Sequence, residues 1–590
     1  MRRKKLLTDN ALQHLASLVA AVEAAEAADV PWRDQARIHF LRNFTIEPVE
    51  PYLKFHLLRE DILPLITFGG YDTMSQEILE PGSSINRDRP DIIVLSLLLD
   101  YLDSGCMAKK WNADEALGRL DDLLTLALDR TDSLIITNTL LPPIDLLFDD
   151  SADAHRVAQV RRLNDRMRQF ADTNPQRMRI ADWEQTLVDF GTKKGIDKRF
   201  WKLSQAPFTA PVLNRMAIDV VKQVRALKGS SKKCLILDCD NTLWGGVIGE
   251  DGMDGIELHP DELPGSAFYK LQQSALKLHE QGVLLALCSK NNEEDVWEVL
   301  RAHPHCLLKR SNLVAWRINW KNKAENIVSL ANELNLGIDS FVYVDDSPRE
   351  CALVSEFLPE VTVIQVPEEL ECYADLLIKD GLFDSLTQSD EDRRRTQMYQ
   401  EATRRQQDES SFDDLTDYLK SLGTIAEISR PTDGDLARVA QLTQRTNQFN
   451  LTTRRYSETE IREFVADKES AVYSMKVRDR YGDMGLTGVF IAKREGSTGI
   501  VDSLLLSCRI LGRQLEFAFV DQCMQMLEEL WHLDSWKAEY VPTLKNAQVA
   551  EFWDQIGLRL AHEESGHRRY ISELGSRPSD YIKIMQVHVE

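Results

Sequence analysis

The chain has 590 residues, of which 43% are hydrophobic and 28% charged, and its formal net charge is -23. That length predicts several domains, because one domain usually holds about 100–200 residues. The ordinary composition excludes a disordered or collagen-like chain. The acidic charge disfavours nucleic-acid binding, and no apolar run reaches the roughly 20 residues of a membrane span. Nine scattered cysteines without a C-x-x-C pair favour a reduced, cytoplasmic protein.

The first region alternates short apolar runs with helical patterns. Residues 91–100 and 132–142 are apolar runs typical of buried parallel strands, and the intervening sequence has the periodicity of a helix. This alternation predicts an α/β domain over residues 1–210.

A second α/β domain is predicted over residues 211–385. Apolar strands are expected at 233–240, 283–289 and 340–346, and each run ends in polar residues. The carboxyl ends of parallel strands share one edge, where open α/β sheets bind ligands. We therefore expect these polar residues to gather there.

The last third of the chain contains a linker and a third domain. Residues 388–410 are dense in charge without an apolar stripe, so we expect a solvated connecting helix within a helical linker over 386–420. Residues 421–590 predict a domain of mixed strands and helices.

Carboxylates dominate the predicted edge of the second domain. Asp238 and Asp240 lie two residues apart, which places both on one side of a strand, and Thr242 follows. Asp345 and Asp346 end another strand. Such a group suits a hard, oxygen-seeking cation, most naturally Mg²⁺.

A hydroxyl and an ammonium complete the chemistry expected at this edge. Ser289 ends the middle strand, and Lys321 and Lys323 begin a helix further along the chain. A carboxylate nucleophile, a metal and a lysine are the groups that phosphoryl transfer requires.

The order Asp-x-Asp-x-Thr, Ser, Lys and Asp-Asp resembles the haloacid dehalogenase (HAD) superfamily of aspartyl-phosphate phosphatases. The resemblance implies that Asp238 is the nucleophile and Asp240 the general acid/base. It implies that Thr242 and Ser289 hold the phosphoryl oxygens, and it favours Lys323 over Lys321 as the lysine. The metal ligands implied are Asp238, Asp240 (through its backbone carbonyl), Asp345 and Asp346.

A narrower resemblance covers most of the chain. DCDNTLWGGVIGEDG, SKNNEEDV and YVDDSPREC are similar to the FkbH-like branch of HAD subfamily IIIC. The stretches FGGYDTMSQEIL and RPDIIVLSL resemble its SGNH-like leading domain, and RTNQFNLTTRRY and SCRILGRQLE its GNAT-like trailing domain. The expected architecture is thus three α/β domains, with a central HAD Rossmann-like parallel sheet.

The resemblance implies a glyceryl transferase/phosphatase. Such an enzyme takes the glyceryl unit of 1,3-bisphosphoglycerate, removes phosphate and delivers a glyceryl thioester to an acyl carrier protein for polyketide-type biosynthesis. A plain Mg²⁺-dependent phosphomonoesterase and a non-catalytic scaffold for carrier proteins are the alternatives.

Cys239 distinguishes these alternatives. A thiolate attacks activated acyl groups and leaves readily from thioesters, and the resemblance assigns the covalent acyl intermediate to this cysteine. In an ideal strand, however, Cys239 faces opposite to its acidic neighbours, so the relay requires the chain to leave strand geometry by residue 239. The other reading is a buried, inert thiol.

The flanking domains have weaker signals. The first lacks the Gly-Asp-Ser and Asp-x-x-His motifs of SGNH hydrolases, and we expect it to be non-catalytic. In the last domain, the segment Cys508–Gln514 resembles the loop that binds pyrophosphate in acyl-CoA enzymes. Arg509, Gly512 and Arg513 are therefore candidates for binding a carrier protein's phosphopantetheine arm.

Overall fold

The computed structural model describes residues 6–28, 32, 34–108, 110–148, 154–373, 375–378, 380–384, 394–409, 414–446, 448–507, 510–511, 513–543, 546–573 and 586–589. It divides into two compact units, Met1–Leu227 and Lys228–Glu590. The boundary predicted after residue 210 differs from this division, because helix α12 (Ala210–Leu227) packs on helix α3 (Glu50–Arg59) of the first unit. Within the described ranges, every helix is too short or too polar to cross a membrane.

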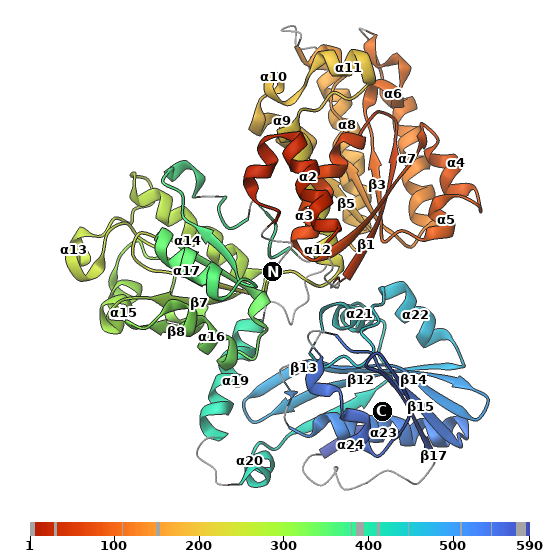
Figure 1. Cartoon of the computed structure of the whole chain (residues 1–590), viewed down its shortest axis with the longest axis vertical. Helices are drawn as coiled ribbons and strands as arrows, with labels where there is room; N and C mark the ends of the chain where they lie inside the picture. Colours follow the sequence, from red (N-terminus) through yellow and green to blue (C-terminus); the bar gives the residue numbers. More distant parts are fainter. Residues whose placement is uncertain are drawn as a thin grey trace. The chain divides into compact units, whose positions relative to one another are not determined.

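The first unit is built on a five-stranded parallel sheet with the order β2-β1-β3-β4-β5 (Figure 1). The two strands predicted from sequence are confirmed as β3 and β4, and the predicted helix between them is α7 (Asp114–Arg130). Leu120, Leu124 and Ala127 of α7 are buried, as its amphipathic period requires. The strands are β1 (Asp34–Arg42), β2 (Ile62–Tyr71), β3 (Ile92–Ser96), β4 (Leu134–Asn138) and β5 (Met178–Ala181).

The second unit begins with another five-stranded parallel sheet, in the order β10-β9-β6-β7-β8. The three predicted strands are confirmed as the three central ones, and their side chains are fully buried. The sequence analysis missed β8 and β10, which lie at the two margins. The strands are β6 (Cys234–Leu237), β7 (Leu284–Ser289), β8 (Leu313–Ile318), β9 (Phe341–Asp345) and β10 (Thr362–Gln365).

The C-terminal part of this unit holds an eight-stranded mixed sheet in the order β16-β17-β15-β14-β13-β12-β11-β18. The strands are β11 (Ile425–Ser429), β12 (Ser470–Asp479), β13 (Gly482–Glu495), β14 (Thr498–Leu506), β15 (Ser535–Tyr540), β16 (Arg559–Glu564), β17 (His567–Glu573) and β18 (Gln586–Val589). Over its described residues, the protein is thus a multidomain α/β chain with two parallel sheets and one mixed sheet.

Two neighbouring strands of the mixed sheet separate along their length. The parallel strands β14 and β15 pair only from Thr498–Ile500 to Ser535–Lys537. Beyond that point Leu451 lies between them: its N–H donates to the Leu504 carbonyl (3.2 Å), and its carbonyl accepts from the Val541 N–H (2.8 Å). The chain itself therefore fills the space where the strands diverge.

Helix α19 (Arg395–Glu409) corrects the expectation of a solvated linker. Met398 and Tyr399 are buried, and so is Arg405. Arg405 binds the carboxylate of Asp479 through two hydrogen bonds of 2.8 and 2.9 Å, while Gln400 donates to the Leu313 carbonyl of β8. The helix contacts both sheets of the unit, and its buried charge has a partner. The charge-dense sequence did not indicate that one side of this helix is buried.

Candidate active site

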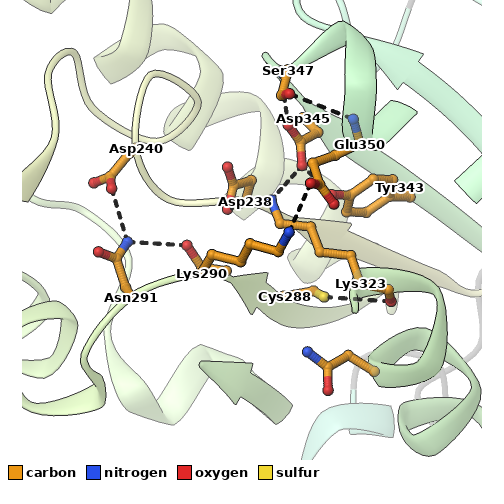
Figure 2. Close-up of polar contacts among 12 residues, drawn as sticks. Asp238, Asp240, Cys288, Lys290, Asn291, Lys323, Tyr343, Asp345, Ser347 and Glu350 are labelled. Atoms are coloured by element: carbon orange, nitrogen blue, oxygen red, sulfur yellow. Dashed lines mark hydrogen bonds and ion pairs between the residues drawn. The ribbon is translucent and has the colours of Figure 1, made fainter. Parts of the chain in front are cut away.

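The predicted polar residues do converge at the carboxyl edge of the central sheet (Figure 2). Asp238 directly follows β6, Ser289 ends β7, and Asp345 ends β9. Lys323 is the first residue of helix α16 (Lys323–Glu333), which follows β8. All four are buried, whereas Lys321 is exposed. The structure thus brings Lys323, and not Lys321, to the site.

The ammonium of Lys323 lies between two buried carboxylates. Its Nζ is 3.0 Å from Asp238 Oδ1 and also contacts Asp345 Oδ2. Burial alone would lower the pKa of Lys323, but the charges of Asp238 and Asp345 outweigh burial and raise it. Lys323 is therefore a permanent positive charge at the edge.

Asp345 is held by its neighbours on several sides. The Ser347 N–H donates to Oδ1 at 2.8 Å, and the Tyr343 hydroxyl donates to Oδ2, the oxygen that also meets Lys323. This hydrogen bonding fixes the carboxylate in one orientation. Sequence reasoning missed Tyr343; its position two residues before Asp345, on the same side of β9, was the available signal.

Three carboxylates are close enough to share a cation. One oxygen each from Asp238, Asp345 and Asp346 lies within 4.8 Å of the others. Burial raises the pKa of Asp238 to about 6 even though Lys323 opposes it, and burial also raises the pKa of Asp346. Concentrated negative charge of this kind, offered by oxygen atoms only, fits Mg²⁺.

The side chain of Asp240 lies outside this group of carboxylates. Its Oδ1 accepts hydrogen bonds from Trp244 Nε1 (3.0 Å) and the Ile248 N–H (3.1 Å), and its Oδ2 accepts one from Asn291 Nδ2 (3.0 Å). These three hydrogen bonds fix the position of the Asp240 carboxylate, and the bond to Asn291 keeps it beside the site. This placement is compatible with the predicted division of roles, in which the Asp240 side chain transfers protons rather than binds metal.

Asn291 is a further residue that the sequence analysis did not identify. It is buried, and its amide nitrogen also contacts Ser289 Oγ at 3.1 Å. One side chain therefore connects the candidate proton donor, Asp240, to the candidate phosphate-binding hydroxyl. Its position two residues after Ser289 was the only hint in the sequence.

Thr242 has an unsatisfied hydroxyl. The residue is fully buried, and among the described residues its Oγ1 has no hydrogen-bond partner. An unpaired buried hydroxyl costs free energy, about 1–3 kcal/mol, unless a ligand pairs with it. A phosphoryl oxygen is the kind of acceptor that this hydroxyl lacks.

The Cys239 thiol contacts the side chain of Ser289 at the site, but the residue is fully buried. Strand β6 ends at Leu237, so the chain has left regular strand geometry, yet Cys239 is 0% exposed and packs in the core with Leu243 and Trp244. Burial raises the pKa of its thiol well above the usual value, and the charge of Asp238 raises it further. A thiolate relay therefore requires a rearrangement that exposes the sulfur.

Only part of the candidate phosphopantetheine site can be described. Arg509 and Gly512 lie outside the described residues. Arg513 is largely buried, and its Nη1 is 3.2 Å from Asp479 Oδ2, the carboxylate that Arg405 also binds. A ligand at Arg513 would have to compete with this ion pair.

Comparison with known proteins gives structural neighbours only. No family model matches the chain, and no curated protein does. The N-terminal part of the protein BF1531 from Bacteroides fragilis, which contains a phosphatase domain complexed with Mg, is 25% identical, with a TM-score of 0.56 over 62% of this chain and 98% of that one.

Smaller neighbours are acetyltransferases. An N-acetyltransferase of a ribosomal protein from Escherichia coli is 12% identical over 26% of this chain and 97% of its own, with a TM-score of 0.21. The PaiA N-acetyltransferase from Thermoplasma acidophilum, in complex with coenzyme A, is 12% identical over 25% and 98%, with a TM-score of 0.19.

Proposed function

We propose that this chain is a Mg²⁺-dependent phosphatase of the HAD type and that its physiological reaction is glyceryl transfer. It would take the glyceryl unit of 1,3-bisphosphoglycerate, remove phosphate and load a glyceryl thioester onto an acyl carrier protein. The observation that carries the phosphatase half is the buried contact of Lys323 with Asp238 and Asp345, beside a third carboxylate. Similarity to a phosphatase domain complexed with Mg supports it.

The residues have distinct roles in phosphate removal. A carboxylate oxygen of Asp238 attacks phosphorus, and the bond from phosphorus to the leaving oxygen breaks. Asp240 gives that oxygen a proton and then takes one from the water that hydrolyses the aspartyl phosphate. Lys323, Thr242 and Ser289 bind the phosphoryl oxygens.

A divalent ion would be held by Asp238, Asp345 and Asp346. When bound, it supplies positive charge against the phosphoryl group and the nucleophile. The ammonium of Lys323 supplies a second positive charge at the same edge. It partly neutralises the neighbouring carboxylates even without a metal ion.

The acyl half of the proposal uses the second reactive group of 1,3-bisphosphoglycerate. A thiolate adds to the acyl carbon, the bond to the acyl phosphate oxygen breaks, and inorganic phosphate leaves. The carrier thiolate then takes the acyl group and frees the first sulfur. The motif resemblance assigns the first sulfur to Cys239, which adjoins the nucleophile Asp238 in sequence.

The burial of Cys239 favours a second candidate, a plain phosphomonoesterase with an inert thiol. Intact-mass measurement after incubation with 1,3-bisphosphoglycerate and Mg²⁺ separates the two. Glyceryl transfer predicts an acyl adduct that maps to Cys239 and is absent from Cys239→Ala, with carrier loading lost and phosphate release retained. Cys288→Ala is the matched control, since Cys288 is equally buried on β7. Equal loading by Cys239→Ala and the wild type would show that Cys239 is not the relay, and no adduct and no loading by the wild type would leave only the phosphatase.

A further inference from the structure

A second set of reactive side chains lies in the first unit, on strands β1 and β2. His39 of β1 and Thr67 of β2 are register partners in the parallel pair, and His39 Nδ1 is 2.8 Å from Thr67 Oγ1. The other ring nitrogen, Nε2, is 3.0 Å from Glu77 Oε2 on helix α4 (Met74–Leu79). A hydroxyl, an imidazole and a carboxylate are thus connected in series.

The carboxylate determines which way the imidazole hydrogen bonds run. An ionised Glu77 only accepts, so the neutral ring must carry its proton on Nε2. The unprotonated Nδ1 then accepts the hydrogen of the Thr67 hydroxyl. That direction is what activation of a nucleophile requires: the hydroxyl points its proton at a base, and a third group orients the base.

Burial is distributed as a nucleophilic site requires. His39 is 1% exposed and Glu77 is 17% exposed in their side chains, whereas Thr67 is an exposed residue. The base and its carboxylate are thus shielded from bulk water, and the hydroxyl-bearing residue is open to a reactant. A hydrogen-bond series that only stabilised the fold could lie entirely in the interior, whereas this one ends at an exposed hydroxyl residue.

The residues around the Glu77 carboxylate fix its position. Glu77 Oε1 accepts hydrogen bonds from the Gly70 N–H and from Thr73 Oγ1. A Cβ placed on Gly69 would come within 2.5 Å of Glu77 Oε1, so a larger residue there would displace the carboxylate. These contacts hold Glu77 against His39 and leave it little freedom to turn away.

We propose that Thr67, His39 and Glu77 form a second catalytic site, which cleaves carboxylic esters or thioesters by acyl transfer through Thr67. Thr67 Oγ bonds to the acyl carbon while its proton passes to His39 Nδ1. The bond to the leaving oxygen or sulfur breaks, and His39 returns the proton to it. Water then hydrolyses the acyl-threonine with His39 as base. The site revises the expectation that the first domain is non-catalytic.

The position of the site indicates the size of its substrate. Among the described residues β2 pairs with β1 alone, so it is an edge strand and one row of its backbone N–H groups points away from the sheet. An exposed threonine on an open edge suits an acyl group carried by a bulky donor better than a small enclosed molecule.

The test uses the full-length chain with two probes, p-nitrophenyl acetate and a fluorophosphonate. Thr67→Val keeps the branched shape and removes only the hydroxyl, Thr67→Ser restores a hydroxyl, and Thr173→Val is the control at another exposed threonine. We expect Thr67→Val to lose at least about 100-fold in ester turnover, and Thr67→Ser and Thr173→Val to stay within about tenfold of the wild type.

The fluorophosphonate gives an independent readout. We expect one adduct, mapped by peptide mass to Thr67, and its formation should slow in His39→Asn. Phosphatase activity, which depends on the other unit, should be unchanged in Thr67→Val, and a thermal melt that matches the wild type shows that the first unit of the variant is folded. Equal ester turnover by the wild type and Thr67→Val, or an adduct at any other residue, overturns the proposal.

Discussion

Replacing Lys323 by Met removes the positive charge shared by two buried carboxylates. The Lys323 side chain is 4% exposed, and those of Asp238 and Asp345 are 9% and 0% exposed. Loss of one partner from a buried ion pair costs about 3–5 kcal/mol, because it leaves charge buried without compensation. We expect a thermal transition roughly 6–20 °C lower, since 1 kcal/mol shifts the melting temperature of a large domain by about 2–4 °C.

The same substitution should remove catalysis. The ammonium neutralises charge on the nucleophile and on the phosphoryl group, so we expect kcat for p-nitrophenyl phosphate to fall at least about 100-fold. Lys321→Met is the matched control: it is exposed, two residues away, and should change stability by less than about 0.5 kcal/mol. A Lys323→Met protein that melts with the wild type, or keeps its kcat, would refute this account of the site.

Three other substitutions test separate features. Asn291→Ala should lower kcat about 10–100-fold and shift the pH–rate profile, while exposed Asn292→Ala should not. Burial raises the pKa of Asp100 to about 6, so its contribution to stability is fully present below about pH 4 and is lost as the pH rises through 6. Asp100→Asn should therefore match the wild type in stability at pH 4 and be more stable by about 2–3 kcal/mol at pH 7; identical stability at both pH values would contradict this. Arg405→Met should destabilise the second unit by about 1–3 kcal/mol in denaturant melts, because buried Asp479 loses two charge-assisted hydrogen bonds and keeps its contact with Arg513.

Sequence patterns predicted the central strands well for a physical reason. Strands buried on both faces are continuous apolar runs, and β3, β4, β6, β7 and β9 are of this kind. Strands β8 and β10 are only partly buried, so polar residues interrupt them and the runs are too weak to detect. The edge strand β2 was missed for the same reason.

The candidate site was predictable only where its residues end strands. Asp238, Ser289 and Asp345 stand at such ends, and their meeting follows from the parallel order. Asn291 and Trp244 act through contacts that arise in loops, and no period in the sequence places a loop side chain. The burial of Cys239 was not predictable in the same way: its neighbours in sequence are in the site and its thiol contacts Ser289, but the surrounding core covers it completely.

Helix α19 makes the two sheets of the second unit dependent on one another. Its residues donate to the carbonyl of Leu313 at the margin of the five-stranded sheet and bind Asp479 of the mixed sheet. Separating the two by proteolysis or gene truncation would expose buried Tyr399 on one side and remove the two hydrogen bonds of Arg405 to Asp479 on the other. The two sheets of the unit are therefore expected to stabilise one another through this helix, and a break before residue 395 should lower the stability of both parts.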